Sequence, residues 1–237
     1  GGTGGRQKTS AAPGDDRATE LTLTFEEAAF GTEKEVKITR IGQCGQCNGT
    51  CAAAGAKIIT CPSCKGAGEI KSVRQTILGH MSTRRVCDVC YGVGRIPERV
   101  CETCHGVGRM RVTEKIKVRV PAGIHDDAAI RLTGKGDCGA RGGKSGDLYV
   151  RIHVNPHKIF QRKGADIYSE KEIHVAQAAL GDVIEIQTLH GLQKMKIPPG
   201  TASGKTFRLK EQGIPKLKGD GKGDHYINIK VKIPEKL

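Results

Sequence analysis

The chain of 237 residues contains no tryptophan, and its four Tyr and four Phe bring the aromatic content to only 3%. A surface that stacks nucleic-acid bases on aromatic rings is therefore not expected, although the formal net charge is +14. No apolar run is long enough to cross a membrane, and residues 1–10 lack the apolar core of a signal peptide. We expect a soluble, cytoplasmic protein with no membrane partner and no specific nucleic-acid partner.

Motifs of enzyme active sites are also missing from the sequence. There is no GxSxG segment and no pair of carboxylates at a catalytic spacing, and the eight histidines are scattered. Gly143-Lys144-Ser145 has the ending of a phosphate-binding loop, but Cys138 stands where that loop needs its first glycine. We therefore predict that the chain is not an enzyme.

The most specific pattern in the sequence is a short cysteine motif that occurs four times. Each copy has two cysteines separated by two residues and followed by glycine, and the four pairs are Cys44 and Cys47, Cys61 and Cys64, Cys87 and Cys90, and Cys101 and Cys104. In a reducing compartment such pairs bind metal more often than they form disulfides. Because a zinc ion takes four thiolates, the eight cysteines predict two zinc ions per chain.

Spacing alone does not decide which pairs share a metal, because four pairs allow three groupings. An expected hairpin between the second and third pairs, with arms at residues 70–78 and 84–86, favours a nested grouping. An iron–sulfur cluster is a rival interpretation of four thiolates, although a tighter CxxCxxC run is missing. Cys51 and Cys138 are expected to stay unligated. Cys51 stands where the other three motifs have a second glycine, a place that favours a left-handed backbone.

The rest of the chain is a duplication. Residues 120–123, 130–132 and 146–154 resemble residues 197–200, 207–209 and 223–231 at one constant separation. Residues 23–31 resemble 173–181, but this separation is longer by about the length of the segment between Ile41 and Val112, which holds the four cysteine pairs. The sequence therefore predicts two related domains, the first interrupted by a metal-binding module.

Alternating apolar and polar residues predict that the repeated unit is mostly β-strand, at residues 35–38, 116–120, 148–154 and 227–231. Residues 26–30 and 176–180 are expected to form short helical turns, each closed by a glycine. Pro156 and the polar segment 158–164 mark a joint between the two copies. In the cysteine-rich segment Tyr91 is the one aromatic residue, so we expect metal binding rather than hydrophobic burial to hold that segment together.

These features resemble the DnaJ co-chaperones of the class that carries a CxxCxGxG zinc domain. The resemblance runs from about Asp15 to Leu237. It includes the four cysteine motifs, the Leu-Thr-Phe-Glu-Glu-Ala-Ala segment that ends at Gly31, and three further segments at residues 120–123, 146–149 and 156–160. It implies a mainly β fold with two duplicated, β-sandwich-like peptide-binding domains, the first interrupted by an extended two-zinc β-hairpin module.

Domain boundaries follow from the same resemblance. Residues 1–14 are expected to be the remnant of a glycine-rich linker, residues 15–41 with 110–156 the first β domain, residues 42–109 the zinc domain, and residues 157–237 the second β domain. No His-Pro-Asp occurs, so the J domain of the family is expected to be missing and the chain to be a fragment. The helical segment through which the family forms homodimers is expected to be missing as well.

The resemblance also implies function and site residues. The chain would bind unfolded polypeptides, prevent their aggregation and deliver them to a DnaK-class ATPase chaperone. One zinc would be held by Cys44, Cys47, Cys101 and Cys104, and the other by Cys61, Cys64, Cys87 and Cys90. Apolar positions of the peptide groove align with Val36, Ile38, Ile116 and Val150.

Two other classes of function stay open at the level of sequence. The excess of Lys and Arg is compatible with a nucleic-acid-binding zinc protein, which would bind single strands with a steep dependence on salt. CxxC pairs also occur in thiol–disulfide oxidoreductases, but zinc binding occupies the thiolate that such exchange requires.

Overall fold

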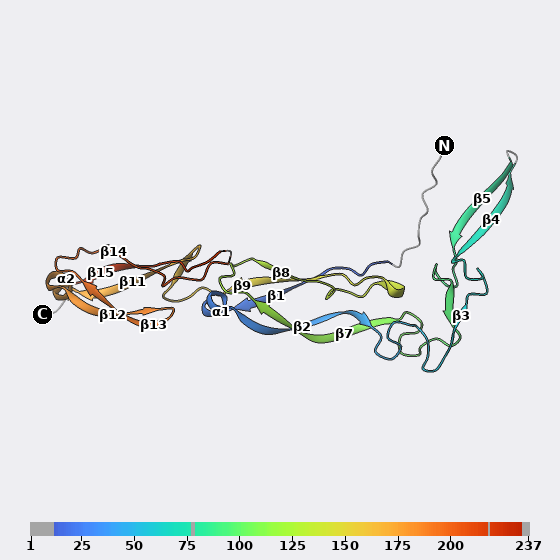
Figure 1. Ribbon diagram of the computed structural model, residues 1–237, viewed down its shortest axis with the longest axis horizontal. Helices are drawn as coiled ribbons and strands as arrows, with labels where there is room; N and C mark the ends of the chain where they lie inside the picture. The colour runs from blue at the N-terminus through green and yellow to red at the C-terminus, as the bar shows by residue number, and fades with distance from the viewer. Residues whose placement is uncertain (1–11, 77–78, 218, 234–237) are drawn as a thin grey trace. The chain divides into compact units, whose positions relative to one another are not determined.

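The computed structural model describes residues 12–76, 79–217 and 219–233, and it confirms a mainly β fold. Its elements in chain order are β1 (Arg17–Leu23), α1 (Phe25–Phe30), β2 (Thr32–Gln43), β3 (Ile58–Thr60), β4 (Glu69–Thr76), β5 (Gly79–Val86), β6 (Arg95–Pro97), β7 (Arg109–Val120), β8 (Ala129–Leu132), the 3-10 turn η1 (Ala140–Gly142), β9 (Leu148–Val154), β10 (Gln161–Lys163), β11 (Asp166–His174), α2 (Val175–Leu180), β12 (Asp182–Thr188), β13 (Gly191–Ile197), β14 (Thr206–Leu209) and β15 (His225–Lys232). Figure 1 shows them along the chain. Within the described ranges, no helix combines the length and the apolar character that a membrane crossing requires.

Contacts divide the chain into two compact units. The first contains Gly1–Thr19, Lys37–Lys115 and Arg131–Val150, and the second contains Glu20–Val36, Ile116–Ile130 and Arg151–Leu237. The sheets follow the order β1-β9-β8, β2-β7, β3-β6, β4-β5, β12-β13 and β10-β11-β15-β14. The expected strands at residues 35–38, 116–120, 148–154 and 227–231 are all present, within β2, β7, β9 and β15.

Both short helices begin and end in the same way, which confirms the two predicted helical turns. Before α1, the Thr24 hydroxyl accepts a hydrogen bond from the Glu27 N–H, and the Glu27 carboxylate accepts one from the Thr24 N–H. His174 and Gln177 form the same reciprocal cap at α2. Such caps satisfy amide groups that the first turn leaves unpaired. Gly31 and Gly181 then end the two helices with φ of 78° and 79°.

The duplication is visible in hydrogen bonds as well as in sequence. In each copy an aspartate that precedes a long strand accepts bonds from one arginine side chain and from one amide of the turn after β8 or β14. These groups are Asp147 with Arg131 and Gly134 in the first copy, and Asp224 with Arg208 and Glu211 in the second. The amide and the arginine hold the pKa of each aspartate below its ordinary value. The same polar turn therefore closes both copies.

One pair of equivalent positions has different chemistry in the two copies. In the second copy Ile167 and Ile214 are fully buried and pack with Phe25, Ala29 and Phe160. Phe160 thus places a core side chain in the segment that we expected to be a polar joint. The Ile167 and Ile214 side chains are removed from water in this core, which stabilises the second unit.

In the first copy the matching residues are Arg17 and Asp137, which form an ion pair at 2.9 Å. Asp137 also accepts a hydrogen bond from the Ile41 N–H at 2.8 Å, close to the end of β2. Burial alone would raise the pKa of Asp137, but the Arg17 guanidinium and the Ile41 N–H hold it below its ordinary value. This ionic contact fixes the strand end from which the cysteine-rich segment departs.

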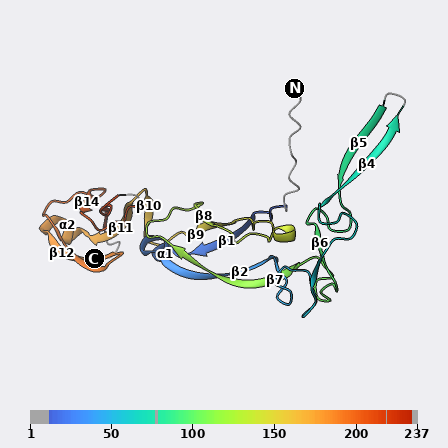
Figure 2. The ribbon, with the colours of Figure 1, turned by 45° about the vertical axis from the view of Figure 1, so that its right-hand side comes forward.

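The cysteine-rich segment lies between the end of β2 and the start of β7. The two strands run side by side (Figure 1, Figure 2), and the hydroxyls of Thr39 and Thr113 meet across them at 3.0 Å. Two antiparallel ladders follow, β3 with β6 and then β4 with β5. The expected hairpin is therefore present. Its second arm starts at Gly79 rather than at Arg84 as predicted, and Leu78 lies outside the described residues.

A histidine is buried in the sheet of the second unit. His225 on β15 has no exposed surface, and its Nε2 lies 2.7 Å from the Ser169 hydroxyl of β11. β11 and β15 are parallel neighbours. Burial disfavours the charged imidazolium and lowers the pKa of His225 to about 4. Leu148 holds the corresponding position in the first copy and is also buried.

We expect the substitution His225→Leu to remove an acid sensitivity of the second unit. The imidazole is protonated near its ordinary pKa of 6.5 in the unfolded chain, but only near pH 4 in the folded chain. Above pH 6.5 His225 is neutral in both states and does not change the free energy of unfolding. As the pH falls from 6.5 to 4, only the unfolded chain takes up the proton, so the folded state loses stability. Between pH 7 and pH 5 this group alone lowers the free energy of unfolding by about 2 kcal/mol. Urea unfolding followed by tyrosine fluorescence at both pH values measures the difference.

Ser169→Ala is the matched control, because it removes the hydroxyl partner at 2.7 Å and keeps the buried imidazole. This control should lose as much stability at pH 5 as the unmodified chain, whereas His225→Leu should lose less. An equal loss in all three proteins would show that His225 is not the responsible group.

Candidate metal centres

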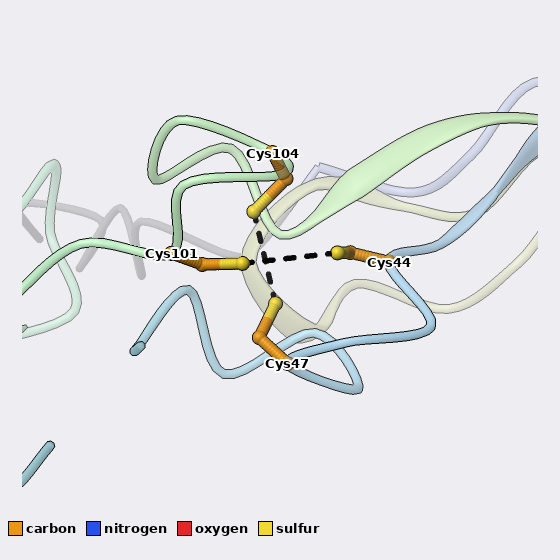
Figure 3. Close-up of side chains that lie close together, drawn as sticks. All are labelled: Cys44, Cys47, Cys101 and Cys104. Carbon is orange, nitrogen blue, oxygen red and sulfur yellow. Dashed lines mark hydrogen bonds between the residues drawn. The ribbon is translucent and has the colours of Figure 1, made fainter. Parts of the chain in front are cut away.

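The first cluster joins the first and last cysteine pairs. The Sγ atoms of Cys44, Cys47, Cys101 and Cys104 all lie within 4.8 Å of one another, and all four residues are buried. Figure 3 shows the side chains directed at a common centre. The Sγ atoms of Cys44 and Cys101 are 3.9 Å apart, and those of Cys47 and Cys104 are 3.7 Å apart. Four thiolate sulfurs bound to one zinc ion at about 2.3 Å occupy the corners of a tetrahedron, and neighbouring sulfurs are then about 3.8 Å apart.

The second cluster repeats this arrangement with the two inner pairs. The Sγ atoms of Cys61, Cys64, Cys87 and Cys90 also lie within 4.8 Å of one another. Cys61 and Cys87 are separated by 3.9 Å and Cys64 and Cys90 by 3.5 Å, which is too long for a disulfide. All ten cysteines are free. Each cluster therefore has the ligand type, number and spacing that a zinc ion takes.

Backbone hydrogen bonds produce the nested grouping. In each motif the first cysteine donates its N–H to the carbonyl at the end of the partner motif. The four bonds are Cys44 to Gly108, Cys101 to Cys51, Cys61 to Gly94 and Cys87 to Gly68, with N to O distances of 2.9 to 3.1 Å. These bonds pair the first motif with the fourth and the second with the third. Of the three groupings that the spacing allowed, the structure has the nested one.

Two glycines of the second centre permit this pairing because the motifs touch there. A Cβ atom on Gly94 would lie 2.4 Å from the Gly66 carbonyl oxygen, and one on Gly68 would lie 2.5 Å from that of Gly92. Gly68 and Gly94 both have a φ of 74°, which a side chain disfavours. The second glycine of the motif is therefore required by close approach as well as by backbone conformation.

Amide groups that the sequence analysis did not single out also contact the sulfurs. The N–H of Gly68 donates to Cys64 Sγ and the N–H of Gly108 to Cys104 Sγ, both at 3.2 Å. Backbone N–H groups, first that of Cys104, lower the pKa of Cys101 to about 7, while burial raises the pKa of Cys104 to about 11. The second glycine of the last three motifs was the signal in the sequence that could have predicted these donors.

Cys51 adopts the left-handed backbone that its position predicts, with a φ of 67°. Its Sγ lies beside Gly108, only 2.7 Å from where a Cβ of that glycine would be, and it belongs to neither cluster. Burial raises the pKa of the Cys51 thiol. Cys138 is buried and likewise lies outside both clusters.

The four residues expected in a peptide groove are not assembled into an exposed site. Val36 and Ile38 lie on β2 and Ile116 on its neighbour β7, with exposures of 7%, 7% and 8%. Val150 is fully buried on β9, in a different sheet between β1 and β8. All four side chains are thus buried, and their role in binding stays a prediction.

The fold and the two four-cysteine centres together indicate the class of protein. It is a metal-binding β protein with two related copies, the first of which is interrupted by the metal centres. Residues 17–234 match the family model of the DnaJ C terminal domain, and the chain belongs to this family. It is 44% identical over 236 residues to the chaperone protein DnaJ of Syntrophobacter fumaroxidans and 48% identical over 238 residues to that of Geobacillus kaustophilus. Both matches cover 100% of this chain but only 60% and 62% of those relatives.

We expect Gly94→Ala to disrupt the second metal centre. The new methyl group would lie 2.4 Å from the Gly66 carbonyl oxygen, so the two motifs must move apart. The purified variant should retain about one zinc equivalent, whereas the unmodified chain binds about two. Gly45→Ala is the control, because a Cβ there meets nothing within 4 Å. Atomic absorption measures the metal content, and full zinc content in both variants would contradict the proposed role of the glycine contact.

We expect Cys51→Gly to strengthen zinc binding at the first centre. Glycine adopts a φ of 67° without the strain of a side chain, which is worth about 1 kcal/mol. Competition with a chromogenic chelator should therefore show about fivefold tighter binding. Weaker binding would instead show that the Cys51 thiol helps to hold the metal.

Proposed function

We propose that the chain binds non-native polypeptides, prevents their aggregation and delivers them to a DnaK-class ATPase chaperone. The observation that carries this proposal is the family match over residues 17–234, together with whole-chain similarity to proteins named as DnaJ chaperones. The chain spans 60% and 62% of the length of these two relatives. The proposal therefore concerns only the part of their function that this region performs. We place this function in the cytoplasm.

We further propose that Cys44, Cys47, Cys101 and Cys104 hold one zinc ion and that Cys61, Cys64, Cys87 and Cys90 hold the other. We propose that both zinc ions are structural. In the described part of this segment, the two clusters of buried side chains consist of cysteines. Structural zinc contributes about 10 to 16 kcal/mol to the folding of small domains. In this chain, the bound ion would replace the hydrophobic core that the segment lacks.

The proposed domain division follows the sequence repeat. Residues 15–41 and 110–156 form the first β domain, residues 42–109 the zinc domain, and residues 157–237 the second β domain. The matching caps and aspartate turns of the two copies support this division.

The proposed peptide site uses the edge of a sheet in the first β domain. β1 is the end strand of the order β1-β9-β8, so its outer edge can accept an extended peptide by backbone hydrogen bonds. Val36, Ile38, Ile116 and Val150 are the apolar residues that we propose to contact the side chains of the peptide, and because all four are buried, the strands that carry them must open on binding. Burying one such side chain is worth about 1.5 to 3 kcal/mol, so binding through one or two of them is weak and reversible.

We expect the double substitution Ile38→Ser with Ile116→Ser to weaken the suppression of aggregation. Loss of two apolar contacts should raise the concentration needed for half-maximal protection by about tenfold. Light scattering of chemically unfolded luciferase, diluted into the zinc-loaded chain, measures this concentration.

Ile184→Ser with Met195→Ser is the matched control for loss of stability. These two residues face each other across β12 and β13, and each is 6% exposed, close to the 7% and 8% of Ile38 and Ile116. The control should retain protection if it stays folded by circular dichroism. Equal losses in both double variants would show that stability, and not a groove in the first domain, explains the effect.

A further inference from the structure

A hollow of about 370 Å³ lies within the second compact unit. Its walls come from the turn after β7, from β10 and the turn that follows it, and from the loop after β14. This volume is in the range of pockets that bind small molecules. No cysteine lines the hollow, and neither does any of the four residues expected in the peptide groove. It is therefore separate from both sites described above.

The ionisable side chains that line this hollow are all basic. They are Arg162, Lys216 and His125, and the lining contains no Asp or Glu. Among the residues that the structure describes, none of the three forms an ion pair with a carboxylate. A concave surface with charge of one sign attracts ions of the opposite sign. The hollow therefore has the electrostatic character of an anion site.

Backbone carbonyls hold the Arg162 guanidinium in a fixed orientation. Its Nε donates to the Gly164 carbonyl at 2.8 Å, its Nη2 donates to the Gly123 carbonyl at 2.7 Å, and its Nη1 donates to the Ile124 carbonyl. These bonds use three of the five guanidinium N–H groups and leave one on each Nη atom. Two such N–H groups can bind two oxygens of one phosphate or carboxylate. Arg162 is thus positioned by the backbone and keeps two donors for a ligand.

The positive charge of Arg162 is partly buried and lacks a counter-charge. Burial lowers the pKa of Arg162, and no carboxylate among the described residues opposes this effect. The carbonyl oxygens satisfy hydrogen bonds, but they carry no net charge that could replace the lost hydration. An anion in the hollow would supply that charge, and its attraction to Arg162 is stronger than at a fully exposed arginine because less water screens it.

The duplication shows that the fold itself does not require these basic residues. At the equivalent positions the other copy has small uncharged residues, namely Ala12, Gly139 and Ala202. In the first copy, a Cβ atom on Gly139 would lie 2.7 Å from the Ala12 carbonyl oxygen, so that copy has no room for a lysine there. The same backbone framework therefore closes without the three cations, which leaves them available for binding.

We propose that this hollow binds a small organic phosphate, with the phosphate group held by Arg162, Lys216 and His125. Arg162 would donate its two remaining N–H groups, Lys216 would add a second positive charge, and His125 would donate one ring N–H. Pro215 and Leu217 line the hollow beside these groups and would contact the apolar part of the ligand. A nucleotide base fits less well, because no Phe, Tyr or Trp lines the hollow to stack on it.

The test titrates phenyl phosphate with the zinc-loaded chain of 237 residues and follows the ligand by phosphorus NMR. The signal should shift and saturate as expected for a single site on each chain. Two competitors define the chemistry of the site. Inorganic phosphate lacks the apolar part and benzoate carries a smaller negative charge, so each should displace phenyl phosphate only at higher concentration.

Lys216→Gln should weaken the binding of phenyl phosphate by about fivefold. Its matched control is Lys222→Gln, which removes the same charge from the same loop. Lys222 is exposed, pairs with Pro215 through the backbone and does not line the hollow. The control should bind as the unmodified chain does.

Arg162→Gln should weaken binding by about tenfold or more, because charge-assisted hydrogen bonds are lost. Arg162 also holds three backbone carbonyls, so circular dichroism must show that this variant is folded. Lys216 is exposed, and Lys216→Gln keeps the inference testable if Arg162→Gln fails to fold.

Four results would overturn the inference. The first is a phosphorus signal that does not saturate. The second is an equal loss in the two lysine variants, which would show attraction by the overall positive charge of the chain. The third is displacement by benzoate as readily as by unlabelled phenyl phosphate, which would show a site for carboxylates. The fourth is undiminished binding by a folded Arg162→Gln variant.

Discussion

The organisation of the cysteine-rich segment depends on the backbone hydrogen bonds that pair one motif with another. The Cys61 N–H binds the Gly94 carbonyl and the Cys87 N–H binds the Gly68 carbonyl, each at 2.9 Å. These bonds bring four sulfurs to the corners of one tetrahedron, with distances that suit a single zinc ion. The backbone bonds and the metal ligands therefore favour the same grouping of the motifs. Without the glycines that allow the close approach, the thiols would not converge.

The two copies of the β domain show how one backbone framework serves two purposes. At equivalent positions the second copy has the apolar pair Ile167 and Ile214, which joins a core with Phe25. The first copy has Arg17 and Asp137, and this aspartate also binds the Ile41 N–H next to the cysteine-rich segment. An apolar pair offers no acceptor for that amide, so the ionic pair is the one that can anchor an inserted segment.

Local patterns in the sequence predicted most of the secondary structure and the cysteine clusters. The caps of α1 and α2, the strands and the hairpin all follow from neighbouring residues, whose preferences act over a few positions. Contacts between distant residues could not be predicted in this way. The burial of Phe160 in a polar segment, the Arg17 to Asp137 ion pair and the Arg141 to Tyr91 contact each join residues that are adjacent only after folding.

The use of thiolates in place of a hydrophobic core has a consequence for binding. In a domain that folds by burial, valines at the density found here would be turned inward, and exposing them would lower stability. Where metal binding supplies the free energy of folding, apolar side chains such as Val89, Val93 and Val100 can stay about half exposed at little cost. A metal-organised arm can therefore present a rigid apolar surface to a partner. Contact with such a surface does not compete with the folding of the arm itself.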